Sequence, residues 1–121
     1  MTKHPLFKTL DDINRLRNAQ RPLFELGQLL STPGAMRALD AWELTVFWLV
    51  EQHRHGEWGD LGPEDKALND QALLNGGRIF SAYDVKNAAQ DSNTRLYVIT
   101  EAVNESTGRR DSTTVLRADE Y

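Results

Sequence analysis

The sequence contains no cysteine. This absence excludes a disulfide framework, a metal site built from thiolates and a cysteine nucleophile, and it favours the reducing cytosol. Long apolar runs are also missing: none approaches the roughly 20 residues that span a bilayer. The first ten residues mix charge with proline instead of forming an apolar signal core. We therefore expect a cytoplasmic protein that uses no membrane.

An excess of positive charge is missing as well. The chain has 14 Lys and Arg against 18 Asp and Glu, for a net charge of −4. Binding to a phosphate backbone depends mainly on Lys and Arg, so non-specific nucleic-acid binding is disfavoured. A local basic patch that binds nucleic acid is still an alternative, because Arg15, Arg17 and Arg21 lie close together near the start of the sequence.

What is present is the composition of one globular domain. The chain has 121 residues, of which 40% are apolar and 26% charged. A chain of this length buries roughly two-thirds of the surface that it exposes when unfolded. We expect it to fold without a cofactor, metal or partner.

The first segment is an N-terminal helical arm, residues 1–21, attached to a single α+β domain, residues 22–121. Thr9 precedes a helical pattern in which Leu10, Ile13 and Leu16 recur at helical spacing, with acids in the first turn. The apolar stripe is narrow. The helix therefore either docks on the main body, which is the favoured alternative, or serves as a contact arm.

The middle of the chain predicts one strand and three helices. An apolar run of strand length covers residues 23–30, and Thr32-Pro33 is a typical start for a short helix to about Leu39. Asp40 and Glu43 form a capping-box pattern before an almost wholly apolar helix, which we expect to be the most buried. That helix ends near Gly56. A further helix runs from Pro63 to Asn75-Gly76-Gly77.

The last third predicts strands. Residues 78–86, 94–101 and 112–117 alternate or are rich in β-branched and aromatic residues. The connections, residues 87–93 and 104–111, are short and polar, which favours a three-stranded antiparallel meander. With residues 23–30 this gives an α+β fold: a small antiparallel sheet of about four strands, with three helices packed on one face and an extra N-terminal helix.

Residues 22–121 contain a series of short motifs: Leu26-Gly27-Gln28, Thr32-Pro33-Gly34-Ala35, residues 55–61, Gly77-Arg78-Ile79, Ser81-Ala82-Tyr83, residues 98–102 and residues 113–116. In order and spacing these motifs resemble a family of small, uncharacterised bacterial proteins found on plasmids and other mobile elements. Some members of that family are labelled as type I restriction subunits, which their size does not support. The resemblance implies no catalytic residues, and a mobile-element setting favours factors that interfere with host defence, such as anti-restriction or anti-CRISPR proteins.

The densest polar cluster is residues 53–60. A metal site is one interpretation, with His53, His55, Glu57 and Asp60 as ligands of a small hydrolase or nuclease. A general acid or base role for either histidine is another. The structural alternative, which we favour, places the histidines at a negative helix end and folds Trp58 back onto the core.

Two further patterns suggest binding surfaces. Tyr83, Arg95 and Tyr97 could share one side of the sheet, as in several binders of single-stranded nucleic acid, although cross-strand packing is the commoner reason for such residues. An acidic set could imitate DNA, although acids also favour helix first turns for local reasons. Its members are Asp60, Glu64, Asp65 and Asp70.

The function that we expect is non-enzymatic. The sequence favours a protein-binding factor that acts through the exposed side of the sheet or through the N-terminal arm. Candidate binding residues are Arg15, Arg17, Trp58, Tyr83, Arg95 and Tyr97. An exposed edge strand would also allow a homodimer by sheet extension. The alternatives are the metal-dependent hydrolase or nuclease and a nucleic-acid binder or its mimic.

Overall fold

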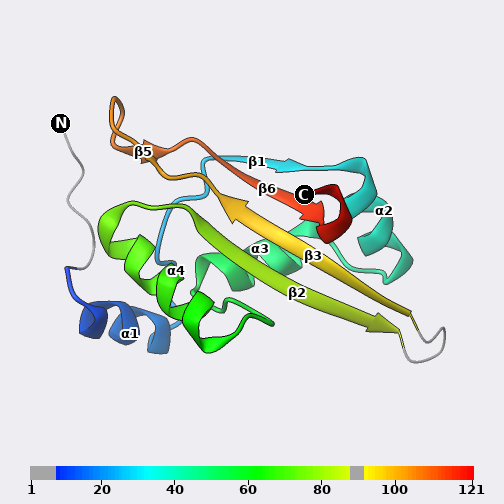
Figure 1. Ribbon diagram of the computed structural model, residues 1–121, viewed down its shortest axis with the longest axis horizontal. Coiled ribbons are helices and arrows are strands. Elements are labelled where there is room, and N and C mark those ends of the chain that lie inside the picture. Colours follow the sequence, from blue (N-terminus) through cyan, green and yellow to red (C-terminus); the bar gives the residue numbers. More distant parts are fainter. Residues whose placement is uncertain (1–7, 88–91) are drawn as a thin grey trace.

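The computed structural model describes residues 8–87 and 92–121 (Figure 1). A four-stranded sheet has the order β1-β6-β3-β2, and β4 and β5 form a small second sheet. No helix in these ranges is both long and apolar enough to cross a membrane. The elements are α1 (Leu10–Asn18), β1 (Gln28–Ser31), α2 (Pro33–Ala41), α3 (Val46–Arg54), α4 (Pro63–Asn75), β2 (Ile79–Asn87), β3 (Ser92–Thr100), β4 (Val103–Asn104), β5 (Arg109–Arg110), β6 (Ser112–Arg117) and the 3-10 turn η1 (Ala118–Glu120).

The predicted α+β class is confirmed. Strands β2, β3 and β6 form the antiparallel meander, with Tyr97 opposite Ala82 on one side and Leu116 on the other. Strand β1 pairs with β6 in parallel, so the sheet is mixed and not wholly antiparallel. Short hairpins force neighbouring strands to be antiparallel, but three helices separate β1 from the meander and leave its direction free.

The first strand is shorter than predicted. Strand β1 covers only Gln28–Ser31, because Gly27 breaks the extended run with φ +66°. A side chain at Gly27 would clash with the backbone carbonyl of Arg110. Before this bend, Leu23 turns into the core, where its N–H donates to the Arg54 carbonyl at 2.8 Å and its side chain is 2% exposed.

Local capping signals place three helix ends correctly. Thr9 caps α1 by accepting the N–H of Asp12, and Thr32 caps α2 by accepting the N–H of Ala35. Helix α4 ends at Gly76, which adopts the left-handed conformation with φ 80°. Each of these signals acts within a few residues of chain, which is why the sequence alone reveals it.

The predicted start of α3 is wrong. Asp40 lies inside α2, and Glu43 has φ 58° in the turn that follows, so no capping box forms. Helix α3 begins at Val46 after Thr45, whose side chain makes no capping hydrogen bond. The prediction that this helix is the most buried one is confirmed, since three of nine residues are exposed in α3, five of nine in α1 and in α2, and eight of 13 in α4. Two of the three exposed residues of α3 are aromatic. Phe47 and Trp48 are 67% and 48% exposed.

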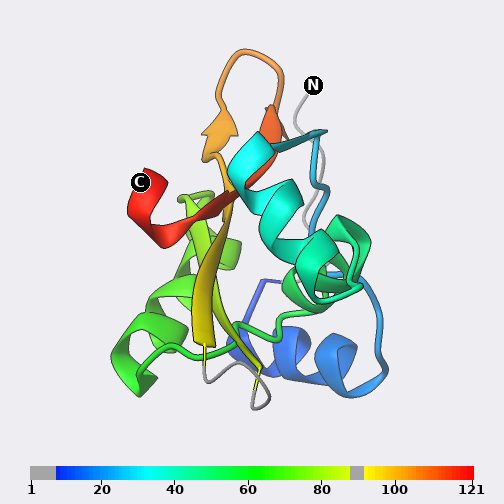
Figure 2. The ribbon, with the colours of Figure 1, turned by 90° about the vertical axis from the view of Figure 1, so that its right-hand side faces the viewer.

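The core consists of two clusters. Helices α2 and α3 cover one face of the sheet, where Leu39, Leu49 and Val98 are buried in the first cluster (Figure 2). Helix α4 lies beside β2 and α1 packs against α4, so that Ile13 and Trp58 are buried in the second cluster. Helix α1 is therefore docked on the main body. The arm predicted over residues 1–21 is described only from residue 8 onward, and its division from the domain stays a prediction.

On the opposite face of the sheet, η1 and Tyr121 fold back over the strands (Figure 2). The Tyr121 ring contacts the rings of Phe80 and Tyr97 at 5.7 Å in edge-to-face geometry, and Phe80 and Tyr97 lie 4.6 Å apart. Arg78 donates to the Tyr121 hydroxyl at 2.6 Å. The three rings therefore cover part of a sheet face that would otherwise be exposed to solvent.

The outer edge of β2 is covered. The Asn69 side chain donates to the Phe80 carbonyl at 2.8 Å and accepts the Phe80 N–H at 3.0 Å, like a residue of a neighbouring strand. Next to it, Ala82 accepts the N–H of Asp60 at 2.6 Å and donates its own N–H to the Trp58 carbonyl at 3.3 Å. Sheet extension is therefore blocked along this part of β2. The sheet's other edge is the four-residue strand β1.

Candidate interaction surface

His53, the first member of the predicted metal cluster, lies in the core. It is 0% exposed, and its Nδ1 and Nε2 lie 2.6 Å from the Ser81 hydroxyl and 2.8 Å from the Thr100 hydroxyl. Thr100 in turn contacts Thr113, whose hydroxyl donates to the Leu26 carbonyl. Because each hydroxyl has one proton to donate, this series of contacts fixes the direction of every hydrogen bond in it. Thr100 donates to Thr113 and accepts from His53 Nε2–H, and Ser81 donates to Nδ1.

This network keeps His53 neutral. Burial, and to a lesser degree the nearby Arg110 guanidinium, lower the pKa of His53 to about 3. Arg110 is itself buried and donates to the carbonyls of Gly77, Glu101 and Ala72. A histidine with both ring nitrogens engaged and no contact with solvent is a structural group.

The other predicted ligands point elsewhere. The Asp60 carboxylate accepts the N–H of Asp84 at 2.8 Å on the edge of β2. His55 and Glu57 lie on the surface between α1 and α3. The four residues therefore do not converge, and within residues 8–87 and 92–121 no group of three or more His, Asp or Glu is placed to hold a metal ion.

Arg17 and Trp58, two predicted binding residues, meet Asp70 in an internal contact. Asp70 accepts the Trp58 indole N–H at 3.0 Å and pairs with Arg17 at 2.5 Å. The Arg17 guanidinium also lies 5.9 Å from the centre of the Trp58 ring. These contacts join α1 to α4 and to the loop between α3 and α4. Arg15 pairs with Asp12 of its own helix at 3.1 Å.

The predicted aromatic and basic sheet surface is divided between two faces. Tyr83 is buried on the side of α3, and its hydroxyl donates to the Glu57 carbonyl at 2.6 Å. Burial raises the pKa of Tyr83 above its usual value. Tyr97 and Arg95 lie on the opposite face, since their cross-strand partners are Ala82 and Asp84. The idea of one surface shared by Tyr83, Arg95 and Tyr97 is therefore wrong.

The charge of Arg95 on that opposite face is neutralised. Arg95 pairs with both oxygens of Asp84 at 3.1 Å and stacks 6.0 Å from the centre of the Tyr97 ring. The four acidic residues that were considered as a DNA mimic do not form one array. Asp60 and Asp70 are engaged in the contacts described above, while Glu64 and Asp65 occupy the first turn of α4.

The outer face of α3 was missed by sequence reasoning. Phe47 and Trp48 project from it into solvent, whereas Leu49, Val50 and His53 anchor the inner face. Two adjacent exposed aromatic side chains form an apolar patch, which we call the α3 aromatic patch. The amino-acid pattern carries no signal for this patch, because an almost wholly apolar helix start does not reveal which side faces the core.

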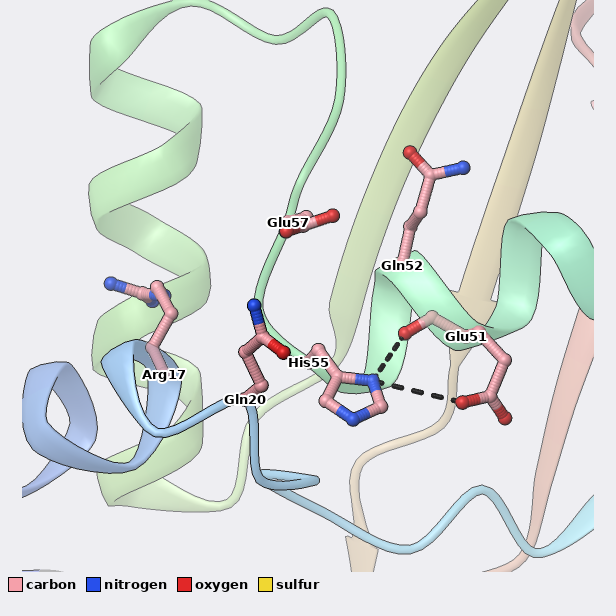
Figure 3. Close-up of a pocket in the computed structure, with 6 residues that line it drawn as sticks. All are labelled: Arg17, Gln20, Glu51, Gln52, His55 and Glu57. Carbon is pink, nitrogen blue, oxygen red and sulfur yellow. Dashed lines mark hydrogen bonds and ion pairs between the residues drawn. The ribbon is translucent and has the colours of Figure 1, made fainter.

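A polar hollow continues this face toward the C-terminal end of α3. Its volume is about 280 Å³, and Figure 3 shows its lining, which comes from α1, the turn after it, α3 and the loop that follows. His55 donates its Nδ1–H to the Glu51 carbonyl at 2.6 Å, which in the neutral imidazole leaves Nε2 as an acceptor. The six lining residues are Arg17, Gln20, Glu51, Gln52, His55 and Glu57.

Carboxylates set the charge of this hollow. Arg17 is neutralised by Asp70, and Glu51 forms ion pairs with Arg54 at 3.4 Å and with His55 at 3.8 Å when the imidazole is protonated. Within the described ranges, the Glu57 side chain forms no ion pair. The hollow therefore carries a surplus of negative charge. Its volume lies below the roughly 300–1,000 Å³ of typical small-molecule sites.

Comparison of the chain with protein families, with curated proteins and with solved structures gives no match. The candidate surface is therefore interpreted from its own geometry and chemistry.

Proposed function

We propose that the protein is a non-enzymatic factor that binds another protein through the outer face of α3. The observation that supports this most directly is the exposure of Phe47 and Trp48 side by side, at 67% and 48%, on a helix whose other face is anchored in the core. Because α3 is packed on the core, the backbone that carries both rings is already ordered before binding. Little backbone conformational entropy is then lost when a partner covers them.

The residue types fit a protein interface. Tryptophan and other aromatic side chains dominate the residues that contribute most to protein–protein binding, and they are usually surrounded by a polar rim. Here the polar hollow with Glu51, His55 and Glu57 lies toward the C-terminal end of the helix that carries the aromatic rings. The arrangement therefore combines an apolar centre with polar groups that can set specificity.

Catalysis is less well supported than binding. The six residues of the hollow include no Ser, Thr, Cys or Lys that could act as a nucleophile. His53, the histidine with a strongly shifted pKa, is sealed in the core. The hydrolase hypothesis also loses its ligand set, since its four proposed ligands lie apart. These features favour recognition without turnover.

The resemblance to mobile-element proteins directs the search for the partner. We propose that the partner belongs to a host-defence system and that binding modulates its activity. Direct binding to nucleic acid receives less support, because Arg95 is paired with Asp84 and Arg17 with Asp70. A nucleic-acid binder needs Lys and Arg groups that can neutralise phosphates.

Affinity capture from a bacterial lysate tests this proposal. The bait is the full chain, compared with the double variant Phe47→Ala/Trp48→Ala and with the control Leu68→Ala, which removes a side chain that is 65% exposed on α4. We expect one protein to be captured by the wild type and by Leu68→Ala and to be lost with the double variant. Circular dichroism and thermal unfolding show whether each variant is folded. Capture that is indifferent to Phe47 and Trp48 contradicts the proposal.

A further inference from the structure

We infer that the outer face of α3 recognises a protein segment that carries an apolar anchor and, about 10 Å away, a Lys or Arg side chain. The anchor covers the α3 aromatic patch and the cation enters the polar hollow. This inference rests on the proposed function and adds the chemistry of the partner to it.

The spacing follows from the geometry of α3. Trp48 and His55 are seven residues apart, and a helix rises about 1.5 Å per residue, so the far end of the hollow, at His55, lies about 10 Å from the patch along the helix axis. Trp48, Gln52 and His55 recur at intervals of four and three residues and so lie along one side of the helix. A partner helix spans the same distance in about seven residues, and an extended segment in about three.

The charge of the hollow selects a cation. Glu57 lines the hollow without an ion pair among the described residues, and the Glu51 pairs are exposed and therefore weak. Arg17, the arginine of the lining, is already neutralised by Asp70 at 2.5 Å. An incoming carboxylate would meet Glu57, whereas an ammonium or guanidinium group can pair with it. The side-chain oxygens of Gln20 and Gln52 supply further acceptors.

The size of the hollow fits one long side chain. At about 280 Å³ it is smaller than typical small-molecule pockets. The apolar stems of Lys and Arg pack well along such a rim while the charged head reaches acceptors. A Lys or Arg side chain of the segment whose apolar anchor covers the α3 aromatic patch fits both the size and the charge of the hollow.

Peptide display on the full chain tests the inference. Phage carrying random 12-residue peptides are selected on the immobilised protein, and the enriched peptides are synthesised and titrated by fluorescence polarisation. We expect enrichment of peptides with an aromatic or large aliphatic residue and a Lys or Arg at one of the two spacings. Glu51→Gln/Glu57→Gln should weaken their binding about tenfold and reduce its salt dependence. Phe47→Ala/Trp48→Ala should abolish it.

A matched control separates local charge from net charge. Glu64→Gln/Asp65→Asn removes two carboxylates from the first turn of α4 and should leave the affinity unchanged. If the selected peptides bind only when Phe47 and Trp48 are present but show no enrichment of Lys or Arg, the inference is overturned and the proposed function is unaffected. Selection without any peptide that depends on the patch also overturns it, while affinity capture decides the proposed function separately. A homodimer that Phe47→Ala/Trp48→Ala dissociates in sedimentation assigns the patch to a second copy and overturns it too.

Discussion

At the scale of single residues, His53 shows how a side chain associated with catalysis can serve folding. Its ring links Ser81 on β2 to Thr100 on β3, and it contacts the rings of Phe24 and Trp58 where the two core clusters meet. Burial of a polar ring is tolerated because both nitrogens have partners. The network ends at the Leu26 carbonyl, just before β1.

His53 should make the protein sensitive to acid. The folded pKa of about 3 lies below the ordinary value of 6.5, so between these pH values the unfolded chain binds a proton that the folded chain does not. The free energy of unfolding therefore falls as the pH drops through this window, by about 1.4 kcal/mol for each unit of pKa difference. We expect His53→Gln to be less stable than the wild type at pH 7, with a difference that shrinks toward pH 4.

Urea unfolding at a series of pH values measures this effect. His55→Gln is the matched control, because His55 lies at the surface hollow and should leave the pH dependence of the wild type unchanged. If the wild type and His53→Gln lose stability in parallel between pH 6.5 and pH 4, His53 is not the group responsible.

Gly59 should tolerate no side chain. Its φ is +79°, and a Cβ there would clash with the Ala82 carbonyl and the Tyr83 ring, where the loop pairs with the edge of β2. We expect Gly59→Ala to lower the free energy of unfolding by on the order of 3 kcal/mol. Gly62→Ala is the control, since a Cβ at Gly62 meets open space and should cost about 1 kcal/mol or less through weaker capping of α4. Chemical denaturation of the two variants compares them, and equal losses would contradict this account.

At the scale of elements, the covered edge of β2 explains how a long outer strand avoids pairing with other molecules. Asn69 uses one amide group to replace a neighbouring strand at Phe80, and the loop from Trp58 to Asp60 does the same at Ala82. Unpaired strand edges promote self-association, and side-chain or loop cover is one way to prevent it. A homodimer by extension of β2 at these residues is therefore blocked.

Replacement of Asn69 tests this role. Asn69→Leu keeps a similar volume but leaves the N–H and carbonyl of Phe80 without partners at a part-buried position. We expect a loss of about 2–4 kcal/mol in the free energy of unfolding and an increase in light scattering on concentration. Gln71→Leu, at an exposed position of the same helix, controls for added apolar surface. Similar scattering from both variants would show that the edge is not the cause.

At the scale of the whole molecule, α1 belongs to the packed core. Ile13 is 0% exposed in the second cluster, and Arg17 ties the helix to Asp70 of α4 and to Trp58. A helix of nine residues is marginal in isolation, so its stability comes from this packing. The same docking places Arg17 at the wall of the polar hollow.

Unfolding should therefore involve α1 and the rest of the chain together. We expect Ile13→Ala to lower the free energy of unfolding by about 2–5 kcal/mol and to leave one transition, seen at the same urea concentration by tryptophan fluorescence and by circular dichroism. Leu10→Ala removes a side chain that is 42% exposed on the same helix and should cost far less. A separate early transition for Ile13→Ala would show that residues 10–18 form an independent arm.

The amino-acid sequence by itself determined the features that depend on neighbouring residues. Thr9, Thr32 and Gly76 mark helix ends through contacts within one turn. The residues of β6 were predicted with their observed bounds, 112–117, because their composition suits a pleated surface. The antiparallel meander of β2, β3 and β6 could be predicted as well, because short polar connections favour neighbouring antiparallel strands.

Only the tertiary structure decided which faces are buried. Nothing in the sequence near residues 46–50 distinguishes Phe47 and Trp48 from Leu49 and Val50. The packing of α3 on the sheet separates the two pairs, because it buries Leu49 and Val50 and leaves Phe47 and Trp48 exposed. The same holds for His53, whose partners Ser81 and Thr100 lie 28 and 47 residues away along the chain. Burial and exposure depend on such distant contacts, so the candidate surface became visible only when the helices were packed on the sheet.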